Sequence, residues 1–336
     1  MKKILKVTVV SLLIILLGLS STAGAAQKFI GIATGSTGGT FYPVGVTIST
    51  VVENSIGDEL GIRFSAHTSG GSSANLQMIK NKEIKMAIAG SVPTSQAYRG
   101  VKAYEGKSIT NVRYVTALYP EVVQFVYRKD SGIKELKDFE GKKIAVGPPG
   151  GGGSFYCPTI LETVAGITFD DIKNQYMGYS DSVQALQNNL ISAAYLGASY
   201  PTSAVSEIYA SPADVDMIEF SDEDIAKLRD IAPYYAKIVI EEGTYPGQKR
   251  DLNLVGFKSS LITEKDVSEE VVYKMLEVIY LEKLDELKEK QNALEPVTIN
   301  EAINGLSGAP LHPGAVKFYR DQGIEIPENL IPPEMK

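Results

Sequence analysis

The sequence is poor in the residues that carry most enzymatic chemistry. Its 336 residues include one cysteine, two histidines and no tryptophan. A single cysteine excludes an intrachain disulfide and any Cys-x-x-Cys metal or redox motif. Neither histidine stands in a His-Glu-x-x-His motif, which argues against a zinc site. The nucleophile pattern Gly-x-Ser-x-Gly is also missing. We therefore expect no catalytic residues, no metal and no cofactor, and His312 is expected to serve as a structural hydrogen-bonding residue.

Positive charge is also in deficit, with 33 Lys and Arg against 40 Asp and Glu and a formal net charge of −7. A nucleic-acid partner is therefore not expected, since phosphate contacts need a surplus of basic side chains. The composition, with 44% hydrophobic and 22% charged residues, is that of a globular protein. The length allows about two domains, each with its own core.

The N-terminus has the order of a secretory signal peptide. Lysines stand at positions 2, 3 and 6, a mostly apolar run covers residues 7–19, and Ala23-Gly24-Ala25 supplies a cleavage site. The run is shorter than the ~20 residues that span a bilayer, so a membrane anchor is the weaker interpretation. We expect residues 1–26 to be removed and the mature protein to be periplasmic. In that oxidising compartment the unpaired Cys157 is expected to be buried.

The mature chain alternates strands, glycine-rich turns and helices, which predicts α/β units. Strands are expected at residues 28–33, 62–66, 85–89, 112–118, 122–127, 143–146, 192–196 and 255–261. Helices are expected at residues 43–53, 74–80, 131–139, 155–165 and 268–290. The pattern restarts near residue 122, so we expect two lobes. The first is assigned to residues 27–121 plus 256–336 and the second to 122–255, with a proline-rich tail wrapping the surface.

Three Gly/Ser/Thr turns each precede a helix, at Gly35–Thr40, Thr68–Ser73 and Gly147–Ser154. The first lacks the Gly-x-Gly-x-x-Gly spacing and the third lacks Gly-Lys-Ser/Thr, so nucleotide binding is a weak interpretation. The turns are either tight strand-to-helix connections that need glycine or sites where exposed helix N–H groups bind a small anion. If the lobes face each other, the turns line one cleft, which could hold a carboxylate without an arginine.

Six motifs occur in an order that resembles the TAXI family, the extracytoplasmic solute receptors of TRAP transporters. They are GSTGGTFYPVG (Gly35–Gly45), TSGGSSANL (Thr68–Leu76), LYPE (Leu118–Glu121), KKIAVGPPG (Lys142–Gly150), GTYPGQ (Gly243–Gln248) and PLHPGAVKFYR (Pro310–Arg320). The resemblance implies a two-lobed, type II-like periplasmic binding protein. Each lobe has a mixed, mostly parallel sheet flanked by helices, and the ligand cleft lies between the lobes. It also implies a monomer that closes on glutamate, glutamine or a related carboxylate and delivers it to a membrane-embedded TRAP permease.

The resemblance, carried over by position, predicts fourteen ligand-binding residues. They are Gly38, Gly39, Thr40, Tyr42, Ser72, Ser73, Asn75, Ser91, Val92, Tyr119, Gly153, Ser154, Gly197 and Ala198. For the polar members the alternative is a helix cap, and for Tyr42 it is packing between a helix and the sheet. Polar residues common in the family are replaced by Gly90, Val92, Gly151 and Gly153. We therefore expect a roomier, less polar pocket and an acid larger or more apolar than glutamate.

Two other functions fit the same residues less well. An ABC-type receptor for another solute would share the fold and differ in its permease. A periplasmic enzyme on a related two-lobed scaffold would need a catalytic constellation, and the sequence shows no recognisable motif for one.

Overall fold

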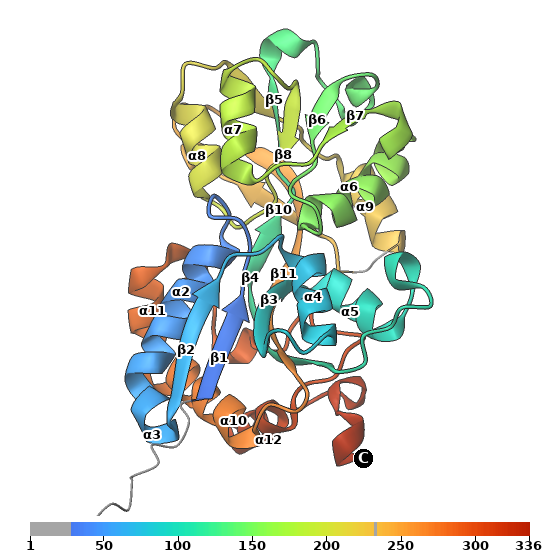
Figure 1. The fold of residues 1–336 in the computed structure, drawn as a ribbon. Helices are drawn as coiled ribbons and strands as arrows, with labels where there is room; N and C mark the ends of the chain where they lie inside the picture. Colours follow the sequence, from blue (N-terminus) through green and yellow to red (C-terminus); the bar gives the residue numbers. More distant parts are fainter. Residues whose placement is uncertain (1–27, 232–233) are drawn as a thin grey trace, which may run out of the picture.

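The computed structural model describes residues 28–231 and 234–336, and it shows two lobes stacked on one another (Figure 1). The predicted signal peptide lies outside the described residues. Among those that are described, no helix is long and apolar enough to cross a membrane. Each lobe has its own sheet and its own buried core, so the site between them is shaped by how the two lobes meet.

A six-stranded sheet in the order β10-β11-β3-β1-β2, with β4 also paired to β11, forms the first lobe, and its edge strand β10 extends to the second lobe, where Ile240 packs in the core. Its strands are β1 (Lys28–Ala33), β2 (Ile62–His67), β3 (Met86–Gly90), β4 (Val112–Val122), β10 (Ala236–Ile240) and β11 (Leu252–Glu264). β1 runs parallel to β2 and β3, whereas β11 runs antiparallel to its three neighbours. The carboxyl ends of β1, β2 and β3 point toward the second lobe, which places the following glycine-rich turns there (Figure 1).

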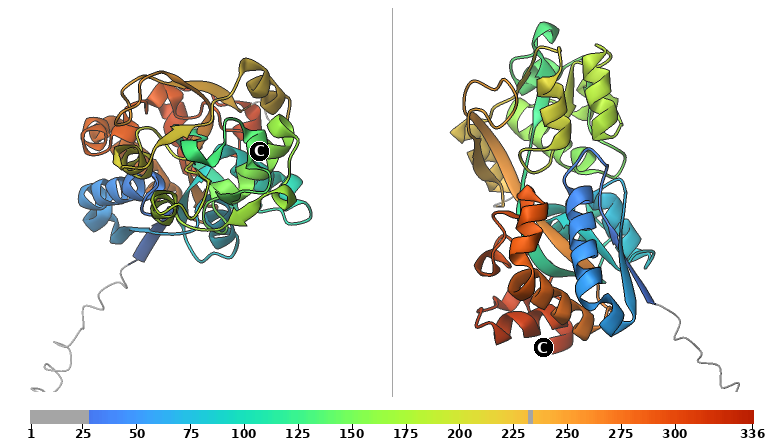
Figure 2. Two further views of the ribbon diagram at one scale, coloured as in Figure 1. Left: turned by 90° about the horizontal axis from the view of Figure 1, so that it is seen from above. Right: turned by 90° about the vertical axis from the view of Figure 1, so that its left-hand side faces the viewer.

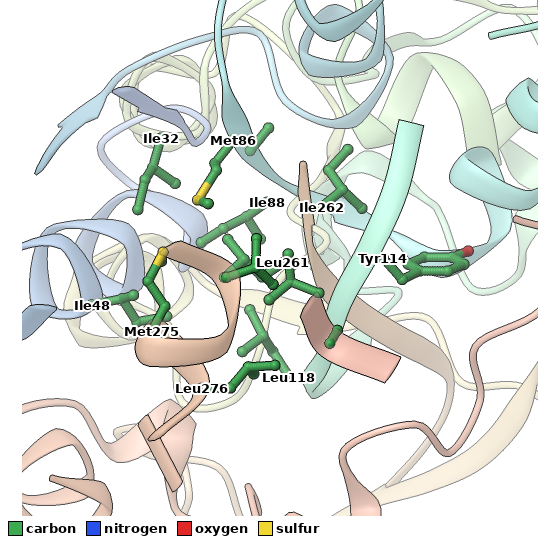
Figure 3. Close-up of a cluster of buried hydrophobic side chains, with 14 of the residues drawn as sticks. Ile32, Ile48, Met86, Ile88, Tyr114, Leu118, Leu261, Ile262, Met275 and Leu276 are labelled. Carbon is green, nitrogen blue, oxygen red and sulfur yellow. The ribbon is translucent and has the colours of Figure 1, made fainter. Parts of the chain in front are cut away.

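The helices of the first lobe cover this sheet and bury an aliphatic core. They are α2 (Phe41–Val52), α3 (Asp58–Leu60), α4 (Ser72–Lys80), α5 (Ser91–Arg99), α10 (Glu269–Glu277), α11 (Leu284–Lys290) and α12 (Pro313–Asp321). Met275 of α10 packs with Ile48 of α2 and Ile88 of β3 in this core (Figure 3). The single helix predicted over residues 268–290 is wrong in length. A π-helical turn at Val278–Glu282 and the extended φ of −131° at Lys283 divide it into α10 and α11.

The second lobe has a five-stranded sheet in the order β7-β6-β8-β5-β9. Its strands are β5 (Phe125–Arg128), β6 (Lys143–Ala145), β7 (Lys173–Gln175), β8 (Ala193–Tyr195) and β9 (Val215–Met217), and its helices are α6 (Gly152–Ile160), α7 (Tyr179–Gln187), α8 (Ser203–Ala210) and α9 (Asp222–Ile231). Cys157 of α6 is fully buried, as predicted. The helix predicted at residues 131–139 is wrong: the segment contains the end of one short 3-10 helix, Lys129–Ser131, and a second one, Leu136–Phe139.

Strands β4 and β11 form an antiparallel bridge between the two cores. Leu118 and Leu261 pack in the core of the first lobe, whereas Val122 and Phe257 pack in the core of the second. Glu121 pairs with Phe257, so it lies on the bridge between the cores. The predicted α/β class with two mixed sheets is confirmed. More of the strand pairs are antiparallel than expected, because β11 runs antiparallel to its neighbours in the first sheet and β5 runs antiparallel to β8 and β9 in the second.

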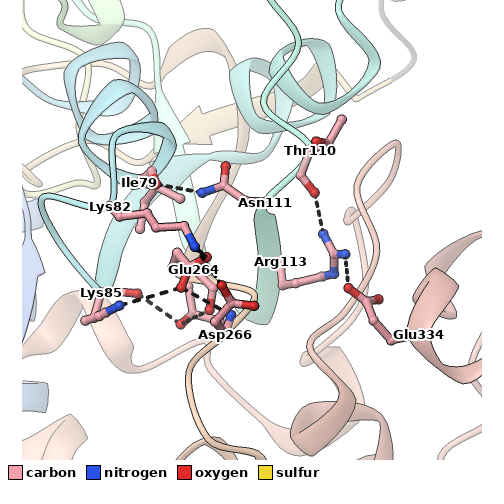
Figure 4. A network of polar contacts seen from close by, with 10 residues as sticks. Ile79, Lys82, Lys85, Thr110, Asn111, Arg113, Glu264, Asp266 and Glu334 are labelled. Carbon is pink, nitrogen blue, oxygen red and sulfur yellow. Dashed lines mark hydrogen bonds and ion pairs between the residues drawn. The ribbon is translucent and has the colours of Figure 1, made fainter.

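Two polar contacts tie the C-terminal part of the chain to the first lobe (Figure 4). The buried Arg113 of β4 donates to Thr110 O and pairs with Glu334 of the predicted surface tail. Glu264, at the end of β11, is fully buried between the ammonium groups of Lys82 and Lys85, at 3.8 and 3.7 Å. These contacts hold the tail and the end of the bridge strand against the first lobe.

His312 has the structural role that the sequence predicts. Its Nδ1 accepts a hydrogen bond from Gly314 N at the start of α12, and its Nε2 lies 3.0 Å from Val267 O. Burial is the main cause of the lowered pKa of this imidazole. The ring therefore caps the helix and joins two segments of the first lobe.

Candidate solute-binding cleft

A small cavity of about 30 Å³ lies where the two lobes meet. The residues that line it are Gly35, Ser36, Gly39, Thr40, Phe41, Gly70, Gly71, Ser72, Glu121, Pro148, Gly151, Gly152, Tyr179, Gly197 and Ala198. All three glycine-rich turns contribute, two from the first lobe and one from the second. The sequence-based expectation that the turns share one cleft is therefore met by the fold.

Four helices begin at this cavity. α2 and α4 start in the first lobe at Phe41 and Ser72, and α6 and α7 start in the second at Gly152 and Tyr179. The N–H groups of Ser72 and Gly152 have no hydrogen-bond acceptor among the described residues, because both are first residues of their helices. Helix starts carry partial positive charge, so their N–H groups favour an anion in the cavity.

The lobes touch directly, so this is a closed arrangement. The loop after β1 reaches up to the second lobe (Figures 1 and 2). There Thr40 Oγ1 lies 2.8 Å from Ser199 Oγ and accepts from Ser199 N at 3.2 Å. Across the other side, Ala74 N donates to Gly150 O at 3.0 Å. The cavity has room for about one or two water molecules. A solute can therefore enter only when the lobes move apart.

One acidic side chain, Glu121, faces the cavity from the bridge. It is 5% exposed, and its Oε1 has no hydrogen-bond partner among the described residues. Burial away from water raises the pKa of this carboxyl from 4.5 to about 8. The hydroxyls of Tyr119, Tyr156 and Tyr195 are likewise buried without partners. Of these four residues only Glu121 lines the cavity, so its carboxyl is the polar group that the protein leaves unsatisfied at the wall.

The structure brings five of the fourteen predicted residues to the cavity wall and places the other nine elsewhere. Those at the wall are Gly39, Thr40, Ser72, Gly197 and Ala198. Those outside it are Gly38, Tyr42, Ser73, Asn75, Ser91, Val92, Tyr119, Gly153 and Ser154. The turns were located correctly, but the side chains that a turn presents depend on its backbone path.

Several of the nine residues have structural environments that keep them off the wall. Ser73 and Ser154 line a separate surface hollow, together with Val92. The backbone of Gly153 packs against the carbonyl of Val146, where a Cβ would lie 2.1 Å from the oxygen. Tyr119 is buried and lines another hollow, beside Pro120.

The other predicted residues that do not line the cavity lie in closely packed segments. Gly38 accepts a hydrogen bond from Thr202 Oγ1 at 3.4 Å. Tyr42 is half-buried on α2, one residue after the lining residue Phe41. Ser91 is the first residue of α5 and is buried, with an unpartnered hydroxyl. These residues lie off the wall of the closed cavity, and their contact with a solute stays a prediction.

The side chain of Asn75 hydrogen-bonds to other segments of the first lobe and does not line the cavity. Its amide nitrogen donates to Thr34 O at 2.7 Å and to Ile88 O at 2.8 Å, and its oxygen accepts from Ser69 Oγ at 2.6 Å. The side chain is fully buried. It therefore joins α4 to the ends of β1 and β3, which is a structural role that neither a cap nor a ligand contact describes.

Replacing Asn75 with alanine is expected to destabilise the protein by about 2–3 kcal/mol, because buried carbonyl groups lose their donor. Urea unfolding at neutral pH measures this. The matched control is Asn81→Ala, since Asn81 is exposed and bonds only Glu83 through its side chain; its effect should stay within about 0.5 kcal/mol. Equal effects in the two variants would contradict the structural role of Asn75.

The closed form leaves little free space at two of the glycines on which the expectation of a roomier pocket depends. A Cβ on Gly90 would lie 2.4 Å from the hydroxyl of Tyr156, so that ring already occupies the space a larger residue would use. A Cβ on Gly151 would meet two backbone oxygens, at 2.8 and 2.9 Å. The missing side chains are thus replaced by a tyrosine and by backbone, and the cavity is small.

Sequence reasoning missed the acid and the aromatic residues of the site. Glu121 ends the LYPE motif, and an acid at the end of a mostly apolar, buried strand is an unusual signal. Tyr179 begins α7, which was not predicted, and its hydroxyl donates to Gly197 O at 2.7 Å. Within the described ranges, no group of three or more His, Cys, Asp or Glu side chains is arranged to hold a metal ion.

Solved structures with a similar fold have low sequence identity to this chain. A protein from Bordetella bronchiseptica RB50 is 16% identical with a TM-score of 0.50, over 90% of this chain and 91% of that one. The alkanesulfonate-binding protein SsuA from Xanthomonas axonopodis pv. citri, bound to MOPS, is 11% identical with a TM-score of 0.46, over 90% and 92% of the two chains. The GluR0 ligand-binding core with L-glutamate is 12% identical with a TM-score of 0.44, over 80% and 99%.

The fold, with two α/β lobes and a cavity between them, is that of two-lobed periplasmic binding proteins. A sequence model of the NMT1-like family matches residues 32–323, and the chain belongs to this family of periplasmic substrate-binding proteins.

Proposed function

We propose that this protein is a TAXI-type receptor that captures a small organic acid and delivers it to a TRAP-type secondary transporter. One observation carries the binding part of the proposal. Four helix starts, two from each lobe, converge on one cavity that no lysine or arginine lines. Main-chain N–H groups are therefore the donors that would hold a carboxylate. The six TAXI-like motifs support the choice of transporter.

Capture would proceed by hinge closure on the bridge formed by β4 and β11. The open form exposes the starts of α2 and α4 on one lobe and those of α6 and α7 on the other. A carboxylate that contacts both sets of N–H groups binds the closed form more tightly and so shifts the population toward it. In the empty protein the contact between Thr40 and Ser199 joins the lobes around a cavity of about 30 Å³, so the lobes stand further apart when a solute is bound.

The proposal keeps the lobe boundaries predicted from the sequence, 27–121 plus 256–336 and 122–255. Residues Val122 and Val255 lie in the second core, and Leu118 and Leu261 lie in the first, which supports crossings near these positions. Export by the N-terminal signal and action as a monomer belong to the same proposal.

Native mass spectrometry of protein purified from its own periplasm would test the binding step. The expected result is one bound organic acid per chain, released by partial unfolding and rebound with protection against heat. Purified protein that carries and rebinds only uncharged or cationic solutes would refute the binding step.

An ABC-type permease is the alternative transport partner. Uptake into proteoliposomes driven by an ion gradient without ATP supports TRAP, whereas uptake only with ATP supports ABC.

A further inference from the structure

Glu121 is a buried acid in a site that otherwise suits an anion. It projects from the bridge strand β4 and lines the cavity on which the four helix starts converge. It is 5% exposed, and its Oε1 accepts no hydrogen bond among the described residues. A buried carboxyl without a partner is costly, so its presence at a binding cavity indicates a partner supplied from outside.

The surroundings of Glu121 supply no compensating positive charge. The titratable groups that face it are hydroxyls, from Tyr119 of the same strand, Tyr156 of α6, Tyr179 of α7 and Tyr195 of β8. Phe257 pairs with Glu121 from β11 and carries no charge. The residues that line the cavity include neither lysine nor arginine. The positive group that would pair with this acid must therefore arrive with the solute.

We infer that Glu121 binds the ammonium group of the solute, and that the protein is selective for zwitterions with a carboxylate and a nearby ammonium group. This inference rests on the proposed function, in which helix N–H groups hold the carboxylate. The donors of the helix starts and the acid then line the same cavity. A compact α-amino acid has the matching charges, whereas the same acid without its amino group leaves Glu121 unpaired.

Binding should release a proton. In the empty closed site Glu121 is mostly protonated at neutral pH, because burial raises its pKa to about 8. When an ammonium group docks, the carboxyl gives its proton to solvent and the carboxylate pairs with the cation, so charge balances. Affinity for a zwitterion should therefore increase as pH rises toward 8 and then level off. A solute that instead received a hydrogen bond from protonated Glu121 would show the opposite trend.

Isothermal titration calorimetry with matched pairs of acids tests the inference. The probes are L-glutamate against glutarate and L-alanine against propionate, measured from pH 6 to 8 in buffers of different ionisation enthalpy. We expect at least one amino acid to bind about 30-fold or more tightly than its deaminated partner, with proton release below pH 8. Glu121→Gln should remove most of this preference and the proton release. Urea unfolding of the variant shows that it remains folded.

The outcomes separate the inference from the proposed function. If deaminated acids bind as tightly as the amino acids, or bind more tightly at low pH, the inference is overturned while an acid receptor remains. If Glu121→Gln is folded and keeps the full preference, the role of Glu121 is overturned. If no member of either pair binds, the proposed function fails, and the inference fails with it.

Discussion

A leucine in place of Gly38 is expected to keep the lobes apart and to weaken solute binding roughly 5- to 150-fold. Gly38 lies on the first-lobe turn, and a Cβ there would be 2.8 Å from Ser180 Oγ and 3.1 Å from Ser180 N in the second lobe. Overpacking of this kind costs about 1–3 kcal/mol, which corresponds to that range of affinity. The clash exists only in the closed form, so opening the lobes relieves it.

The measurement combines solute affinity with small-angle X-ray scattering and urea unfolding. Gly38→Leu should bind weakly, scatter as a more extended molecule with solute present, and unfold at the same urea concentration as the unmodified protein without solute. The control is Gly178→Ala, at the same interface, where the nearest atoms to a Cβ are at 3.6 and 3.9 Å and leave room for it. Full closure of Gly38→Leu around a tightly bound solute would refute the closed form described above.

Replacing Glu121 with glutamine is expected to stabilise the empty protein at neutral pH. The pKa of Glu121 is about 8 in the fold and 4.5 when it is not perturbed, so the folded state binds more protons between these values. The contribution of Glu121 to the free energy of unfolding is fully present below about pH 4.5. It is lost as pH rises, and the loss levels off above about pH 8. By pH 7 the loss amounts to about 3 kcal/mol. The glutamine in Glu121→Gln cannot ionise, so this variant should not show this loss of stability as pH rises.

Urea unfolding of solute-free protein at pH 5 and pH 8 measures the effect. The unmodified protein should lose more stability between these pH values than Glu121→Gln does. The contrasting control is Glu264→Gln, because Glu264 is buried between Lys82 and Lys85 and its removal should destabilise the protein at pH 8. If the free energy of unfolding changes with pH in the same way for the unmodified protein and for Glu121→Gln, Glu121 is ionised in the folded protein at little cost in stability.

Together these results would describe a site that gives up stability for binding. A buried acid without a partner destabilises the empty closed form. A solute that pairs with Glu121 would recover this free energy only when the lobes close around it. The acid therefore makes closure depend on the solute.

The three turns show how far local signals can predict a site. Glycine and hydroxyl residues between a strand and a helix indicate where a helix starts, and the alternation of strands and helices predicts that such starts gather at one edge of a sheet. These signals are local and periodic, so they predicted the two α/β lobes and the convergence of turns at Gly39, Ser72 and Gly152.

What the sequence by itself determined was therefore the class of fold, the burial of Cys157, the role of His312 and the turns that form the cleft. What only the tertiary structure decided was which atoms face the solute. Asn75 turned out to join two strands, and Tyr156 fills the space beside Gly90. Glu121 faces the cleft because β4 and β11, more than a hundred residues apart, pair at the junction of two cores. Such long-range pairing has no periodic signal along the chain, and burial without a partner is a property of the assembled lobes alone.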